Sequence, residues 1–166
     1  MNFSRILRHL FTGPLAVRRL FPGSALIAIE QAIKQSEAGH DGEIRFAVEP
    51  ALNMLPLLAN QPARERAIEA FAQLKVWDTE HNNGVLIYLL LADHDVEIIA
   101  DRGIDVRVGG GNWEKICREM EGAFRRGQFE AGVIAGIRAI GDHLREHFPA
   151  EREGGQNELS DRPVIL

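Results

Sequence analysis

The sequence contains a single cysteine, Cys117, among its 166 residues. A lone thiol excludes an intramolecular disulfide and any metal site built from several thiolates. Because chains without disulfides are typical of reducing compartments, we expect a cytoplasmic protein. Cys117 shares an apolar helix face with Ile116 and Met120, which favours a buried, inert thiol over a reactive one.

The chain also lacks a surplus of positive charge. It has 19 Lys and Arg against 24 Asp and Glu, which gives a formal net charge of -5. Such a chain has no basic excess with which to neutralise a run of phosphates, so we expect no nucleic-acid partner. The one basic region is residues 1–21, which hold Arg5, Arg8, Arg18 and Arg19 and no acid.

Long apolar runs are missing as well. No segment approaches the roughly 18 uninterrupted apolar residues that a membrane span requires. Near the N-terminus, Arg8, His9, Gly13 and Pro14 interrupt the apolar residues before the core of a cleavable signal could form. Residues 3–11 instead have helical spacing and predict a short amphipathic helix. We expect it to pack on the domain or on a second subunit, with adsorption to an anionic membrane surface as the alternative.

Apolar residues make up 45% of the chain, which is enough for one core. Their spacing predicts the secondary structure. Strict alternation over 43–49 indicates a half-buried strand, and the continuous apolar run 84–92 indicates a central strand that a tight turn joins to a third strand at 96–100. Helical periods cover 24–36 with Ser24 as N-cap, 62–74, a segment from Asn112 to Gly127, and 129–147.

This order predicts an α/β fold, namely a three-layer α/β/α sandwich with a small mixed sheet, a βαββαα core and an extra N-terminal helix. We divide the chain into a helix and linker at 1–21, one α/β domain at 22–149, and a tail at 150–166. Because the tail is polar and has no hydrophobic period, we expect it to be mobile.

The predicted topology brings polar residues to one edge of the sheet. A helix joins the first two strands, so they should be parallel, and the hairpin makes the third antiparallel. The starts of the first two strands and the end of the third then share an edge with Asp41, Glu43, Asp78, Thr79, Asn82, Asn83, Asp101 and Arg102. Such oxygen ligands suit calcium or magnesium. The same residue types also build turns and caps, so both interpretations stay open.

Three other sequence motifs give weaker evidence for a function. His143, Glu146 and His147 spell H-x-x-E-H, the inverted zinc-protease pattern, but no further ligand is evident and the end of a helix favours histidines for its dipole alone. The glycines at 109–111 lack phosphate-binding spacing, so we expect a flexible connector. No Ser, His and Asp set with a nucleophile-elbow motif can be assembled.

Three segments, in this order, resemble the TPM domain family: 42–45 (GEIR), Thr79 with 83–87 (NGVLI), and 101–104 (DRGI). Trp113 and the Phe and Gly pairs within 124–132 extend the resemblance over about residues 24–149. The resemblance implies an α/β/α sandwich, acidic residues near one sheet edge that bind a divalent cation, and the phosphatase activity proposed for chloroplast members.

On this resemblance, Asp78 and Asp101 match the metal ligands best, followed by Glu43, Thr79 and Asn82, with Ca²⁺ or Mg²⁺ as the ion. The chain is similar to the short, soluble bacterial branch of the family, without the anchors of other members. Two functions remain. The first is a divalent-cation-binding accessory module that acts through a protein partner. The alternative is a low-activity acid phosphatase, a phosphomonoesterase in which Asp78 and Asp101 hold a metal and Arg102 stabilises negative charge.

Overall fold

The apolar strands of the sequence lie side by side in one mixed sheet, in the order β3-β2-β1-β4. The computed structural model describes residues 3–151 and 157–166. In it, β1 (Glu43–Glu49) pairs in parallel with β2 (Gly84–Leu90), and β2 pairs antiparallel with β3 (Asp95–Ala100). The short helix η1 (Leu91–Asp93) forms the hairpin connection, with His94 left-handed at φ 53°. The three predicted strands and their pairing are thus confirmed.

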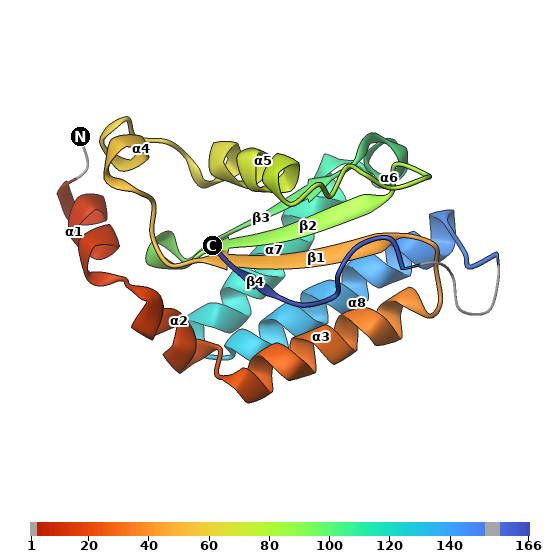
Figure 1. The fold of residues 1–166 in the computed structure, drawn as a ribbon, viewed down its shortest axis with the longest axis horizontal. Coiled ribbons are helices and arrows are strands. Elements are labelled where there is room, and N and C mark those ends of the chain that lie inside the picture. The colour runs from red at the N-terminus through yellow and green to blue at the C-terminus, as the bar shows by residue number, and fades with distance from the viewer. Residues whose placement is uncertain (1–2, 152–156) are drawn as a thin grey trace.

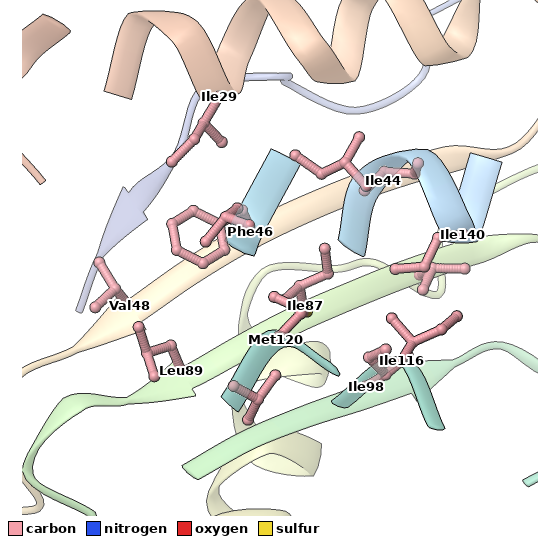
Figure 2. Close-up of a cluster of buried hydrophobic side chains, with 14 of the residues drawn as sticks. Ile29, Ile44, Phe46, Val48, Ile87, Leu89, Ile98, Ile116, Met120 and Ile140 are labelled. Carbon is pink, nitrogen blue, oxygen red and sulfur yellow. The ribbon is translucent and has the colours of Figure 1, made fainter. Parts of the chain in front are cut away.

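Helices cover both faces of this sheet (Figure 1). On one face lie α3 (Gly23–Glu37), α7 (Gly110–Arg125) and α8 (Phe129–His147). The other face carries α5 (Ala63–Gln73). Figure 2 shows the larger core, where Ile29 and Ile140 meet strand residues such as Phe46 and Ile87. The predicted α/β/α sandwich is confirmed.

The strand β1 is buried on both faces, not on one as its alternating sequence predicts. Residues 157–166 cover Glu43 and Arg45 on its polar face, while Arg66 of α5 covers Glu49. The strand β4 (Val164–Ile165) extends the sheet by pairing in parallel with Ala47 and Val48. The prediction of a mobile tail is therefore wrong for 157–166. Of the rest of the predicted tail, residues 150–151 are described and residues 152–156 lie outside the described residues.

Three short helices were not predicted: α2 (Pro14–Leu20), α4 (Met54–Leu58) and α6 (Arg102–Val108). Each has at most seven residues, too few for a hydrophobic period to be read. The glycine connector is also shorter than predicted, because only Gly109, at φ 83°, leaves the helical conformation before α7 begins. Neither Ser24 nor Asn112 caps its helix, since α3 follows Pro22 and Asn112 lies inside α7.

The N-terminal helix α1 (Phe3–Phe11) contacts the domain through its polar face. His9 is only 4% exposed, and its Nδ1 accepts a hydrogen bond from the Leu52 amide at 3.0 Å. Arg5 Nε lies 2.8 Å from the Asp93 carboxylate. Much of the apolar face points to solvent, with Phe11 84% exposed. No helix in the described part of the chain is long and apolar enough to cross a membrane.

Candidate functional site

The edge at which β1 and β2 begin and β3 ends is the candidate site, called the site edge below. Glu43 pairs with Gly84 across the parallel strands, and Val85 pairs with Ala100 across the hairpin. The Asp101 amide continues this ladder by donating to the Gly84 carbonyl at 2.9 Å. The predicted convergence of three strand ends is confirmed.

Asp101 leaves β3 and caps the next helix, α6. Its Oδ1 accepts a 2.7 Å hydrogen bond from the Arg102 amide, while its backbone carbonyl accepts from the amides of Ile104 and Asp105. The second carboxylate oxygen, Oδ2, is buried and has no donor among the described residues. Asp101 is therefore positioned rigidly with one acceptor left over.

Asn83 is fully buried just before β2. Its amide donates to Thr79 Oγ1 at 3.2 Å, its Nδ2 donates to the Asp41 carbonyl at 3.0 Å, and its carbonyl accepts from the Glu43 amide at 3.4 Å. Asn83 Oδ1 is the exception, since it is buried without a donor in the part of the chain that the structure describes. The site edge thus holds a second unpartnered acceptor oxygen.

The loop 78–83 packs directly against the start of α6. A Cβ atom added to Gly103 would lie 2.5 Å from the Asn82 carbonyl oxygen and 2.6 Å from that of His81. Only glycine allows this approach, because those neighbours are backbone atoms that have little room to retreat. Asn82 itself adopts the left-handed conformation at φ 51°, which asparagine tolerates better than most residues.

Of the other predicted ligands, Thr79 has a structural role, since its hydroxyl accepts the Asn83 amide in a turn. Asp78 and Arg102 are exposed, and their side chains have no partner within residues 3–151 and 157–166. Neither Asp78 nor Asp101 belongs to a described group of three His, Cys, Asp or Glu side chains close enough to share an ion. The site edge brings together Asp101, Asn83 and the 78–83 loop without a complete set of carboxylate ligands.

Glu43 anchors the C-terminal segment. Its two carboxylate oxygens accept the amides of Glu158 at 2.9 Å and Leu159 at 3.2 Å. Burial raises the pKa of Glu43 to about 7, with a smaller contribution from nearby acids and against the effect of these two hydrogen bonds. Both oxygens are already used, so Glu43 is less suited to a metal than the sequence predicts.

Beside Glu43, the structure contains an acidic cleft of about 600 Å³ that the sequence analysis missed. Its acidic and histidine lining comprises Glu37, His40, Asp41, Glu43, Glu80, His81, Glu151, Glu158 and Asp161. Partly buried Glu37 accepts the Ile44 amide at 2.8 Å, and Asp161 accepts the Asn157 side chain at 2.8 Å. Asp161 could not be placed from the sequence, because it comes from the segment interpreted as a mobile tail.

Two carboxyl groups of the cleft, those of Glu37 and Glu43, have raised pKa values. Burial raises the pKa of Glu37 to about 9, and the neighbouring Glu43 adds to the shift. Arg45 lies beneath the C-terminal residues 157–166 and donates to the backbone carbonyls of Ser160 and Arg162. One buried guanidinium beside three acids leaves an excess of acidic groups, which favours the neutral form of Glu37 at neutral pH.

The last turn of α8 reaches the same end of the molecule. The Phe148 carbonyl accepts the Asp41 amide at 2.9 Å, and Arg107 donates to the His147 carbonyl at 2.8 Å. Here His143, Glu146 and His147 each offer a ligand atom, and the three atoms lie within 4.8 Å of one another. They form the one such group among the described residues.

Comparisons with known proteins agree with this architecture. Residues 19–143 match the family model of the TPM domain. The solution structure of the BA42 protein from the psychrophilic bacterium Bizionia argentinensis is similar, with 28% identity, a TM-score of 0.76, and coverage of 88% of this chain and 95% of that one. The N-terminal domain of a P. gingivalis protein shares the fold at 19% identity and a TM-score of 0.64, covering 80% and 83%. Among curated proteins, none matches.

Proposed function

Because this chain belongs to the TPM domain family, we propose that it is a divalent-cation-binding accessory module that acts through a protein partner. The observation that carries the proposal is the pair of buried oxygens, Asp101 Oδ2 and Asn83 Oδ1, without a donor among the described residues. Leaving a buried acceptor unpaired costs about 1–3 kcal/mol. A bound cation removes this cost by supplying positive charge to both.

The chemistry of these atoms favours a hard cation. Carboxylate and amide oxygens are ligands for Ca²⁺ and Mg²⁺, and Ca²⁺ accepts irregular sets completed by backbone carbonyls and water. Asp101 and Asn83 would hold the ion. The exposed Asp78 side chain and oxygens of Thr79 and Asn82 are the further candidates from the adjacent loop. Glu43 would contribute least, because its oxygens already accept two amides.

The partner part of the proposal is supported by exposed apolar residues on α1, α2 and α4. Phe3, Leu10, Phe11 and Leu15 expose more than half of their surface, and so does Leu55. Exposed apolar groups that gather on one region mark interaction surfaces. The parent protein should capture a partner protein from cell extract, and the Phe11→Ser variant should not. Binding to anionic vesicles instead would assign these residues to a membrane.

A calcium titration followed by backbone amide NMR tests the cation site. We expect shifts at residues 79–84 and 101–103, and an affinity at least about tenfold weaker in Asp101→Asn, which keeps a capping oxygen but loses the charge. Asp142→Asn, on an exposed residue of α8, is the matched control and should bind like the parent. Equal affinity in Asp101→Asn, or no shifts at millimolar Ca²⁺, would refute the site.

The alternative is a low-activity phosphomonoesterase. Arg102 favours it, since its exposed side chain follows Asp101 directly and can face a phosphoryl group beside a bound ion. Hydrolysis of para-nitrophenyl phosphate should then require a divalent cation and fall in both Asp101→Asn and Arg102→Gln. Activity that Asp101→Asn leaves intact would come from a contaminant, and the phosphatase assignment would fail.

A further inference from the structure

We propose that His143, Glu146 and His147 form a second metal site, selective for a transition ion such as Zn²⁺ and separate from the oxygen site at Asp101. One ligand atom from each residue lies within 4.8 Å of the other two. Residues three and four apart share one face of a helix, so the last turn of α8 brings all three to the same side. A movement of a few tenths of an ångström up to about one ångström would bring them to a common ion, whose bonds to N and O ligands are about 2.0–2.2 Å long.

The ligand atoms are available. His147 Nε2 lies 4.0 Å from Glu146 Oε2, too far for a hydrogen bond, and the rings of His143 and His147 make no other polar contact within the described ranges. Glu146 is 70% exposed, while the two histidines are half-buried. The site therefore has one side against protein and one side open to water, which can fill the remaining coordination positions.

Neighbouring residues hold the His143 ring and the backbone at the end of α8 in place. The His143 ring packs edge-on against Trp113, with centroids 5.7 Å apart, and Trp113 Nε1 donates to Asp105 at 2.9 Å. Arg107 fixes the end of α8 through the His147 carbonyl. Rotamers that are held by packing lose less entropy when an ion binds, which increases affinity.

The donor set decides which ion binds. Two imidazoles with one carboxylate suit Zn²⁺, Co²⁺, Ni²⁺ and Cu²⁺, whereas Ca²⁺ and Mg²⁺ prefer oxygen ligands only. The C-terminal end of α8 adds negative potential that attracts a cation. The guanidinium of Arg107, stacked 4.5 Å above the Phe148 ring, opposes it. We therefore expect micromolar rather than nanomolar affinity.

This arrangement differs from a zinc protease. In the H-x-x-E-H pattern of those enzymes the glutamate is the general base and a distant residue completes the ligands. Here Glu146 is itself the third ligand within reach. His143, Glu146 and His147 are thus the ligands of a metal-binding site and not the catalytic residues of a peptidase.

Trp113 allows the site to be tested directly. Untagged Trp77→Phe protein retains Trp113 as its one tryptophan. Cu²⁺ should quench its fluorescence with a stoichiometry of one per chain, and Zn²⁺ should reverse the quenching by competition. His143→Ala and His147→Ala should each weaken Cu²⁺ and Zn²⁺ binding at least about tenfold. His94→Asn is the matched control for an exposed histidine outside both proposed sites and should titrate like the parent.

Two further variants keep the outcome decisive. Glu146→Gln, on an exposed side chain, should weaken Zn²⁺ binding even if a histidine variant fails to fold. Asp101→Asn should leave Zn²⁺ binding unchanged, so that failure of the calcium site and failure of this site are distinguishable. Unchanged Zn²⁺ affinity in both Glu146→Gln and a folded histidine variant, or loss of Zn²⁺ binding in His94→Asn, would overturn the proposal.

Discussion

Two aspartates at opposite ends of the sheet have opposite surroundings. Asp93, at the hairpin end, contacts Arg5, Arg8 and His9 of α1 at 2.8, 3.2 and 3.1 Å. Burial alone would raise its pKa, but the hydrogen bonds from these three residues outweigh burial and lower it. Asp101, at the site edge, has one oxygen without a donor among the described residues. A carboxylate whose oxygens all have partners stabilises the fold. A carboxylate with a buried oxygen that lacks a donor can instead bind a ligand.

The largest expected effect is at the hairpin end. Asp93→Asn removes the carboxylate that faces the guanidinium of Arg5, and breaking a buried ion pair typically costs about 3–5 kcal/mol. We expect a loss of about 3 kcal/mol in the free energy of unfolding, measured by urea denaturation, with α1 released first. Asp142→Asn, which breaks an exposed pair with Arg145, should cost under about 1 kcal/mol. Equal losses in the two variants would show that Asp93 does not hold α1.

At the site edge, the close approach of the 78–83 loop to α6 is the second target. Gly103→Ala places a methyl group 2.5 Å from the Asn82 carbonyl, so it should destabilise the protein by about 1–3 kcal/mol and disturb Ca²⁺ binding. Gly111→Ala, in α7 with nothing within 4 Å of the added atom, should stabilise by up to about 1 kcal/mol. A Gly103→Ala variant with the same free energy of unfolding as the parent would contradict the tight packing of this edge.

The acidic cleft predicts a dependence of stability on pH. The folded pKa values of Glu37, about 9, and Glu43, about 7, lie above their ordinary value of 4.5. The folded state therefore binds these protons more tightly than the unfolded state does. Stability from these groups should be lost as pH rises from about 4.5, through about 7 for Glu43, to about 9 for Glu37. Measured by thermal unfolding across this pH range, Glu37→Gln should lose less stability than the parent. Parallel curves of stability against pH for the two proteins would refute the raised pKa of Glu37.

The smallest effect on stability is expected on the outward face of α1. Phe11 is mostly exposed, so Phe11→Ser should change the free energy of unfolding by no more than about 0.5 kcal/mol. Ile140→Ala in the core should cost about 2–5 kcal/mol in the same urea measurement. A large loss in Phe11→Ser would mean that the apolar face of α1 contributes to the fold.

Much of this molecule could be predicted from its apolar residues. The run 84–92 and the alternation at 43–49 specify strands because burial repeats with the period of the backbone. The connections then bring Glu43, Asn83 and Asp101 to one edge, as observed. Here sequence reasoning succeeded because a helix and a hairpin leave few ways to arrange three strands.

The short helices α2, α4 and α6 were missed because of their length, whereas the errors at the tail and at α1 come from polar contacts between distant residues. Residues 157–166 are ordered because Glu43 accepts the amides of Glu158 and Leu159 and Arg45 donates to Ser160, none of which produces a hydrophobic period. For the same reason, Asp93 turns the polar face of α1 inward. Asn83 was placed at the edge but not chosen as a ligand, since its unpartnered oxygen appears only once its other bonds are known.

The most direct test of the central claim is a crystal structure of the protein grown with CaCl₂, with anomalous diffraction used to identify the ion. We expect calcium about 2.3–2.6 Å from Asp101 Oδ2 and from Asn83 Oδ1, and loss of that ion in Asp101→Asn. A water molecule or a protein donor at Asp101 Oδ2, with calcium bound elsewhere or not at all, would contradict it.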